Sequence, residues 1–333
     1  MRSLPRAAVT LVGLALLLAA CAGTSAPAAT HAVFGMDFEP FTLPGQSPIG
    51  GAIPDDAQLK SLLGVLRGRT AWLKTSGSSA AQERIPCLAH AMGFKVAATA
   101  FLNGNADDQA ELGRLEANIS AGCVELAVVG NEAVWHELLS GTQSATYIKQ
   151  VRCDTTPPSR PPCSGRPGVM YGAAEPDELY RAGSPGQKYG AADVEAEMAA
   201  SDIFLTNIPA FNYGDTLAAA AADVPSRYQA ISRVATRLTR THARAWIGES
   251  EWPSGCEQFG HADWCKDPRA TPTSAAAYFK QFETWAGSAG VHTFYYEAFD
   301  NAWAGRFDLG YGNHWGVFDA SGKLHQGFEQ GFP

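Results

Sequence analysis

Short apolar runs alternate with amphipathic helical stretches along most of the chain. The apolar runs predict strands at 32–38, 69–74, 95–102, 124–130, 168–173, 202–209, 244–248 and 291–297. Apolar positions at helical spacing predict helices at 55–66, 79–92, 107–121, 144–151, 191–200, 226–241 and 274–289. Strict alternation of this kind indicates parallel strands that are joined by helical crossovers.

Eight such strands fit an α/β fold with a single closed (β/α)8 TIM barrel over residues 32–333. A doubly wound sheet is the alternative, but it would carry a Gly-rich phosphate loop after its first strand. The segment Gly-Met-Asp-Phe-Glu-Pro at 35–40 is no such loop. The tail 300–333 shows no clear helical pattern, so we expect a long loop with an irregular closing segment in place of the last helix.

The N-terminus has the pattern of an export signal. Two arginines precede the apolar run 7–20, which is too short for a comfortable membrane span. The run ends in Leu-Ala-Ala-Cys at Cys21, which resembles a bacterial lipobox, whose cysteine is lipidated; an ordinary signal peptide is the alternative. The residue after Cys21 is Ala22 and not Asp. The resemblance therefore implies an exported lipoprotein of the bacterial cell envelope, anchored in the outer membrane. We expect residues 1–20 to be the signal peptide and 21–31 a flexible tether.

Composition narrows the class of partner. Hydrophobic residues make up 46% of the chain and charged residues 17%, a balance typical of a globular domain. The formal net charge of −8 argues against nucleic acid, because phosphate binding requires a basic face. It also argues against surface attraction to anionic lipid.

Apart from Cys21, the cysteines form an even set, which in an exported chain indicates disulfides. They are Cys87, Cys123, Cys153, Cys163, Cys256 and Cys265. Sequence does not determine which of the possible pairings forms. Proximity favours Cys153–Cys163 and Cys256–Cys265, and this leaves Cys87 with Cys123. Metal binding is the competing interpretation, but no Cys-x-x-Cys motif or clustered histidines accompany these residues.

Polar side chains gather at the predicted carboxyl ends of the strands, where a barrel of this type places its chemistry. Strands four to eight end at or near Asn131, Glu132, Glu175, Asn207, Glu249, Glu251, Glu297 and Asp300. Aromatic residues that could stack on sugar rings are interleaved with them: Trp135, Phe211, Tyr213, Trp252, Tyr295, Tyr296, Trp303 and Trp315. No Gly-x-Ser-x-Gly elbow occurs, so covalent serine hydrolysis has no candidate nucleophile.

Two carboxyl groups across an open rim are what cleavage of a glycosidic bond requires. One is protonated and assists the leaving oxygen, and the other is ionised and attacks or positions water. Single glutamates are usually surface or ion-pair residues, and it is their placement at several strand ends that favours catalysis. Carboxylate pairs perform this chemistry unaided, so we expect neither a metal nor a cofactor.

Four segments resemble glycoside hydrolase family 17. They are VGNE at 129–132, GESEWPS at 248–254, FYYEAFDNAW at 294–303 and HWGVFD at 314–319. The opening segment 35–48 also resembles the first strand and loop of that family. The family comprises retaining β-1,3-glucanases and β-1,3-glucanosyltransferases of clan A, so the resemblance implies a β-glucan oligo- or polysaccharide as the partner.

The resemblance implies roles for individual residues. Glu249 matches the nucleophile and Glu132 the acid/base, which retention would require to lie about 5–5.5 Å apart. Asn131 matches the residue that binds the sugar 2-hydroxyl, and Glu297 a further carboxylate of the site. The remaining residues expected to bind substrate are Glu175, Asn207, Phe211, Tyr213, Glu251, Trp252, Tyr295, Asp300, Trp303, His314 and Trp315.

Three positions depart from the family pattern. Glu251 stands where the family usually has Gly, Ala304 where it often has Lys, and Ala71 where many members have Tyr. These departures bear on linkage preference more than on reaction class. Three alternatives stay open: transfer to a glucan acceptor by the same residues, a non-catalytic glucan-binding envelope lipoprotein, and a β-1,4-glucan specificity.

Overall fold

The structure, a computed structural model, describes residues 33–181, 188–261, 263–306 and 309–332. Eight parallel strands form one sheet in the order β7-β6-β5-β4-β3-β2-β1-β8. They are β1 Val33–Asp37, β2 Thr70–Lys74, β3 Lys95–Ala100, β4 Leu126–Asn131, β5 Met170–Pro176, β6 Leu205–Asn207, β7 Trp246–Glu249 and β8 Phe294–Tyr295. A parallel bridge between Ile247 and Thr293 joins the two outer strands, so the sheet closes into the expected barrel.

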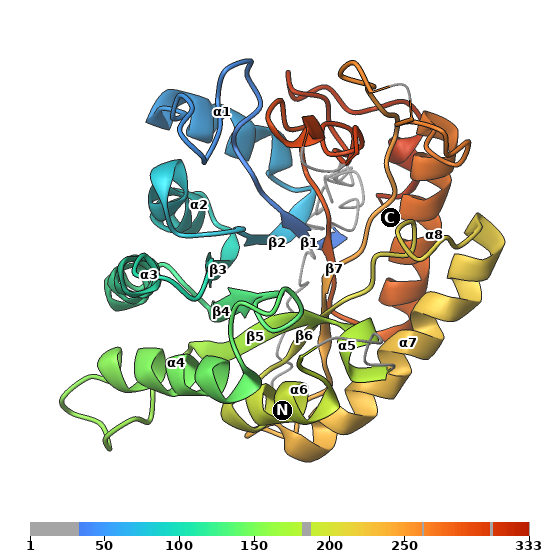
Figure 1. Cartoon of the computed structure of the whole chain (residues 1–333). Coiled ribbons are helices and arrows are strands. Elements are labelled where there is room, and N and C mark those ends of the chain that lie inside the picture. The colour runs from blue at the N-terminus through green and yellow to red at the C-terminus, as the bar shows by residue number, and fades with distance from the viewer. Residues whose placement is uncertain (1–32, 182–187, 262, 307–308, 333) are drawn as a thin grey trace, which may run out of the picture.

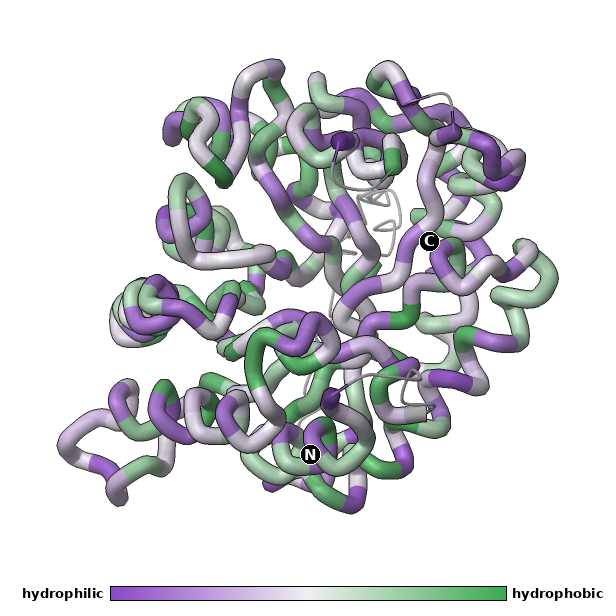
Figure 2. Tube along the Cα trace, in the orientation of Figure 1, coloured by the Kyte–Doolittle hydropathy of each residue, from purple (hydrophilic) through white to green (hydrophobic). Residues whose placement is uncertain are grey.

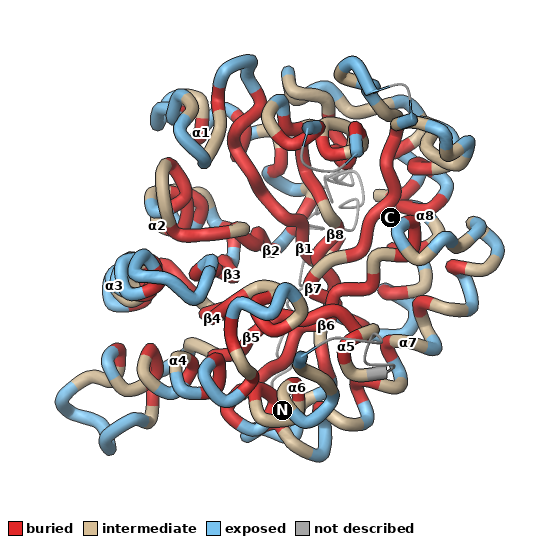
Figure 3. The backbone as a smooth tube through the Cα atoms, in the orientation of Figure 1, coloured by how far each residue is buried: buried red, intermediate tan, exposed pale blue. Residues whose placement is uncertain are grey.

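Helices surround the ring of strands, as Figure 1 shows. They are α1 Asp56–Leu66, α2 Ile85–Ala91, α3 Asp108–Ala121, α4 Gly141–Asp154, α5 Asp177–Arg181, α6 Ala191–Ala200, α7 Leu217–Leu238 and α8 Pro272–Ala289. The central strands are buried, whereas the outward faces of the helices are exposed (Figure 3). Hydrophobic and hydrophilic residues alternate around the turns of these helices (Figure 2), as expected for helices with one face on a core.

Apolar side chains occupy two separate cores. The larger lies between strands and helices, and the smaller includes Trp72, Leu126, Val128, Leu205 and Phe294 from alternate positions of the strands. In a barrel such inward positions fill the interior with side chains. The interior is therefore a packed plug, and polar groups gather at the carboxyl ends of the strands.

The sequence prediction was wrong about the start of α7. The predicted helix began at residue 226, directly after Pro225. The observed helix begins at Leu217 and contains that proline. Thr216 caps the helix by accepting a hydrogen bond from the Ala219 amide at 3.1 Å. Proline normally breaks a helix, but here a continuous buried face on both sides of Pro225 stabilises the whole element through tertiary packing.

Other boundaries differ by local capping. Helix α4 begins three residues earlier than expected, at Gly141, because Ser140 and Gln143 form a capping box. The predicted helix 79–92 is a 3₁₀ turn, Ala80–Arg84, followed by α2. Helix α5 was not predicted. After β8 the described part of the tail contains only the 3₁₀ turns Ala304–Arg306 and Phe328–Gln330, so the expected irregular closing segment is confirmed.

Three disulfides tie loops to the barrel. They join Cys87 to Cys123, Cys153 to Cys163 and Cys256 to Cys265, the pairing that proximity favoured. Cys21, the expected signal peptide and the tether lie outside the described residues. In the part of the chain that is described, no helix has both the length and the apolar character that crossing a bilayer demands.

Candidate active site

The carboxyl ends of the strands bring ionisable and amide side chains to one rim. Asp37 ends β1, Lys74 ends β2, Asn131 ends β4, Asn207 ends β6 and Glu249 ends β7. A cavity of about 420 Å³ opens there. It is lined by Glu132, Trp135, His136, Pro176, Glu178, Asn207, Pro209, Asn212, Tyr213, Glu249, Glu251, Tyr296 and Trp315.

Glu132 follows β4 in a left-handed backbone conformation, with φ of 57°. Its amide donates to the Ala174 carbonyl at 2.8 Å, which ties the turn to β5. Asn207 Nδ2 donates to Glu132 Oε1 at 2.8 Å, and His136 Nε2 lies 3.4 Å from Oε2. The hydrogen bond with Glu132 raises the pKa of His136 above its usual value. Both oxygens of the Glu132 carboxyl therefore have defined neighbours.

Glu249 is held by a buried cation. Lys74 Nζ donates to Glu249 Oε1 at 2.8 Å and to Asp37 Oδ1 at 2.7 Å. Burial alone would lower the pKa of Lys74, but the charges of Asp37 and Glu249 outweigh it and raise the pKa, so the ammonium stays charged. Burial raises the pKa of Glu249, the Lys74 charge opposes this, and the charge of Glu132 adds to the rise.

Two asparagines connect the two glutamates. Asn207 Nδ2, which binds Glu132, also lies 3.4 Å from Asn131 Oδ1. Asn131 in turn hydrogen-bonds Glu249. Glu132 and Glu249 also line the same cavity, so both carboxyl groups face one mouth of the barrel.

Two further carboxyl groups lie deeper, behind β1 and β8. Glu297 is fully buried and accepts a hydrogen bond from Asn301 Nδ2. Burial, then the nearby charge of Glu39, raise the pKa of Glu297 well above its usual value. Burial likewise raises the pKa of Glu39, against hydrogen bonds from Ser76 and Trp303. Burial therefore favours the protonated form of both carboxyl groups.

A model of the BtgE/BtgC glycoside hydrolase domain matches residues 35–316, which is most of the chain. The chain belongs to this family. It is therefore a glycoside hydrolase, and the predicted relationship to family 17 is confirmed.

Characterised relatives of this BtgE/BtgC domain act on glucan. A glucan 1,3-β-glucosidase of Candida albicans is 23% identical over 252 residues, 71% of this chain and 74% of the relative. One from Saccharomyces cerevisiae is 24% identical over 202 residues, 59% of each chain.

Solved structures share the fold of the BtgE/BtgC domain. A family 17 β-1,3-glucanosyltransferase from Rhizomucor miehei superposes with a TM-score of 0.67 at 18% identity, over 90% of this chain and 96% of that one. An active-site mutant of the same enzyme with laminaritriose gives a TM-score of 0.66 at 18% identity and the same coverage. At this identity the likeness concerns the barrel itself.

The structure of the BtgE/BtgC domain brings together part of the expected substrate-binding set. Six of the expected site residues line the cavity: Glu132, Asn207, Tyr213, Glu249, Glu251 and Trp315. Asn131 reaches it through its contact with Glu249. Trp303 lies against Glu39, next to the deep carboxyl groups.

Three expected aromatic platforms are part of the core instead. Trp252 is 1% exposed and its indole N–H donates to the Arg269 carbonyl at 3.0 Å. Phe211 packs against Trp252 with ring centroids 5.5 Å apart, and Tyr295 is fully buried against Phe279. Tyr295 lies in β8, where successive side chains point to opposite sides of the sheet, and it faces the packing layer.

Four expected polar residues do not line the cavity and have structural partners instead. Glu175 is 1% exposed and bonds to backbone amides after Glu132. Glu297 is buried as described above. Asp300 binds His325 Nε2 at 2.8 Å and the Gly316 amide at 3.0 Å. The carbonyl of His314 accepts the hydroxyl of Ser254 at 3.0 Å, which ties down the last loop.

Sequence reasoning missed Asp37, Glu39, Lys74 and His136. The predicted polar strand ends covered strands four to eight only. The first two predicted strands also have polar residues at their ends, Asp37 and Lys74. The same rule applied to all eight strands would have found both. His136 carries the weaker signal of four-residue spacing from Glu132, which places it one helical turn away.

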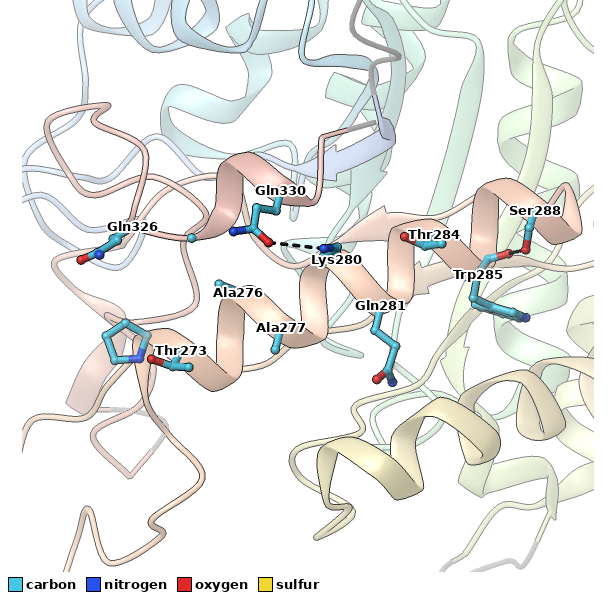
Figure 4. A pocket seen from close by; sticks show the side chains of 12 residues that line it. Thr273, Ala276, Ala277, Lys280, Gln281, Thr284, Trp285, Ser288, Gln326 and Gln330 are labelled. Atoms are coloured by element: carbon cyan, nitrogen blue, oxygen red, sulfur yellow. Dashed lines mark hydrogen bonds between the residues drawn. The ribbon is translucent and has the colours of Figure 1, made fainter.

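A second hollow, about 840 Å³, lies on the outer side of α8 (Figure 4). Its wall is formed by α8 and by Gln326 and Gln330, and Lys280 binds Gln330 across it. None of its lining residues is a carboxylate, so it offers no acid or nucleophile. Among the described residues no group of three or more His, Cys, Asp or Glu side chains is arranged to hold a metal.

The substitution Lys74→Met should lower the free energy of unfolding of the BtgE/BtgC domain by about 3 kcal/mol, because it leaves two buried carboxyl groups without their cation. Urea denaturation of wild type and variant measures this. Arg237→Met is the control, since Arg237 pairs with Glu195 at 3.5 Å on the surface and should cost less than about 1 kcal/mol. Equal losses in the two variants would contradict the buried-cation account.

Proposed function

We propose that this glycoside hydrolase cleaves β-1,3-linked glucan with retention of anomeric configuration. Glu249 is the nucleophile and Glu132 the acid/base. The observation that carries the proposal is the placement of both carboxyl groups on one cavity, linked through Asn131 and Asn207. The two glucan 1,3-β-glucosidases among the relatives support the choice of substrate.

In the first step an oxygen of Glu249 attacks the anomeric carbon as the bond to the leaving oxygen breaks. Glu132 gives its proton to that oxygen, so the departing glucan leaves as a neutral alcohol. In the second step Glu132 takes a proton from the incoming hydroxyl, whose oxygen displaces Glu249 from the anomeric carbon. The charge of Lys74 opposes protonation of Glu249, and its Nζ holds Glu249 Oε1 at 2.8 Å.

An uncharged polymer suits the electrostatics of the cavity. Glu178 and Glu251 line it together with the two catalytic glutamates, so an anionic sugar would be repelled. Trp135, Tyr296 and Trp315 contribute aromatic faces to the same wall, and such faces suit the apolar sides of glucose rings.

The incoming hydroxyl of the second step can belong to water or to another glucan. For transfer to another glucan, the second candidate function, Tyr213 is a candidate platform, because it lines the cavity and its ring is held by neighbouring side chains. Its hydroxyl donates to Asp177 Oδ1 at 2.7 Å, and the Arg227 guanidinium lies 4.0 Å from its ring centroid. A fixed ring at the cavity can hold an acceptor sugar without loss of side-chain entropy.

Glu132→Ala and Glu249→Ala should each lower kcat/KM on laminari-oligosaccharides by at least about 100-fold. With added azide and an aryl β-laminaribioside, whose leaving group needs no acid, Glu132→Ala should form a β-glycosyl azide and Glu249→Ala an α-glycosyl azide, because azide replaces water in the first variant and the nucleophile in the second. Mass spectrometry and NMR identify these products, and wild-type products longer than the substrate mean transfer.

Glu195→Gln, at a partly exposed position of α6 outside the cavity, serves as the control and should keep wild-type kinetics. Near-wild-type turnover by either alanine variant would remove that residue from its role.

On the acidic limb of the pH profile, kcat/KM should fall with an apparent pKa above the ordinary pKa of a glutamate. Glu249 attacks only when ionised, and burial raises its pKa, so activity is lost as pH falls through this raised pKa. Lys74→Met removes the charge that opposes the rise and should move the limb to higher pH. The profile is measured on wild type, Lys74→Met and Arg237→Met. A limb that is unmoved or lower in Lys74→Met would refute the role of Lys74.

We also propose that Cys21 carries a lipid that anchors the enzyme in the outer membrane of a bacterial envelope. The Leu-Ala-Ala-Cys motif after an apolar run supports this. Mass spectrometry of the mature chain should find Cys21 as a lipid-modified N-terminus, and Cys21→Ser should release the protein from the membrane fraction. An unmodified mature N-terminus at another residue would indicate an ordinary signal peptide.

A further inference from the structure

The turn that carries Glu132 is clamped by one buried carboxylate from the neighbouring strand. Glu175 lies in β5 and is 1% exposed. Its Oε1 accepts the amide of Val134 at 2.8 Å, and its Oε2 accepts the amide of Trp135 at 3.1 Å. These amides belong to the second and third residues after Glu132, so the clamp acts on the backbone of the catalytic turn itself.

Glu132 needs such a clamp because its own backbone is strained. A φ of 57° lies in the left-handed region, which residues with a Cβ adopt rarely and only when their surroundings fix it. The Glu132 amide bonds to Ala174, the residue that precedes Glu175 in β5. Successive residues of β5 thus bind both sides of the turn, and the direction in which the Glu132 side chain leaves the backbone follows from them.

A second buried carboxyl group stands behind the clamp. Glu197 of α6 is fully buried, and burial raises its pKa to about 8, with a hydrogen bond to Ser144 opposing and the charge of Asp193 adding. Burial first, and then the charge of Glu197, raise the pKa of Glu175. Burial and the charge of Glu197 oppose ionisation of Glu175, and the N–H group on each of its oxygens favours it.

We propose that Glu175 is a positioning residue for the acid/base, which holds the 132–135 turn so that the Glu132 carboxyl stands at the leaving oxygen. Glu175 itself touches no substrate. The inference rests on the proposed role of Glu132, and it assigns Glu175 a task different from the sugar binding expected from its place at a strand end.

The experiment uses two substrates that differ in their need for an acid. When a laminari-oligosaccharide is cleaved, the departing sugar is a basic alkoxide unless an acid protonates it. The 2,4-dinitrophenolate of a dinitrophenyl β-laminaribioside departs without an acid. Glu175→Gln turns one acceptor of the clamp into an N–H group that faces an N–H. It should lower kcat/KM about 100-fold on the oligosaccharide and less than about 5-fold on the dinitrophenyl substrate.

Glu111→Gln is the matched control. Glu111 is also buried, and its Oε2 accepts the amides of Ser78 at 2.8 Å and Phe101 at 3.1 Å, in the loops after β2 and β3. Its substitution perturbs a buried carboxyl group that also binds two backbone amides, and removes the ion pair of its Oε1 with Arg114 at 2.8 Å, away from Glu132. It should lower the melting temperature as Glu175→Gln does, but change both substrates by the same factor.

Glu132→Gln separates failure of this inference from failure of the proposed function. If Glu132→Gln shows the difference between substrates and Glu175→Gln loses both equally or neither, Glu175 has no positioning role. If Glu132→Gln itself shows no difference, the assignment of the acid/base fails. Should Glu175→Gln not fold, Glu175→Asp keeps a buried carboxyl group but shortens its reach to the two amides, and the same difference between substrates is expected from it.

Discussion

The ammonium group of Lys74, buried between Asp37 and Glu249, is the interaction on which the active-site rim depends. Three charged groups in a low-dielectric site are stable only as a hydrogen-bonded set, because each one alone would cost several kcal/mol to bury. The set joins β1, β2 and β7, which meet only because the sheet closes between β7 and β8. Closure of the barrel and ionisation of Glu249 are therefore coupled.

On the side of Asn131 and Asn207, the rim is held by hydrogen bonds from neutral amides and not by ion pairs. Asn131 and Asn207 link Glu132 and Glu249, so an amide side chain binds each of the two carboxyl groups. Amides can satisfy an ionised or a protonated carboxyl equally well, since each amide both donates and accepts. Such bridges suit a pair in which one carboxyl gains and loses a proton during each cycle while the other stays ionised.

Below the rim lies the apolar plug that includes Trp72, Leu126 and Phe294. It excludes water from the barrel interior, and Lys74 and Asp37 are buried. Buried carboxyl groups then fall into two classes. Glu297 and Glu39 lie among carboxyl neighbours, and burial raises the pKa of each. Glu175, by contrast, has an amide on each oxygen and holds backbone. Glutamates at or near strand ends thus have different roles, which depend on the hydrogen-bond donors around each carboxyl group.

The sequence by itself determined the order of strands and helices and the barrel, because these follow from local periodicity. Proximity along the chain favoured the disulfide pairing that forms, and the resemblance to family 17 singled out two glutamates among the carboxylates at strand ends. The sequence did not reveal that α7 runs through Pro225, that Trp252 and Tyr295 face the core, or that Glu175 binds backbone. Only the tertiary structure decided these, because the side of the sheet a residue faces, and the donors it meets there, depend on strands far away in the chain. The Lys74–Glu249 contact, 175 positions apart, is the clearest case.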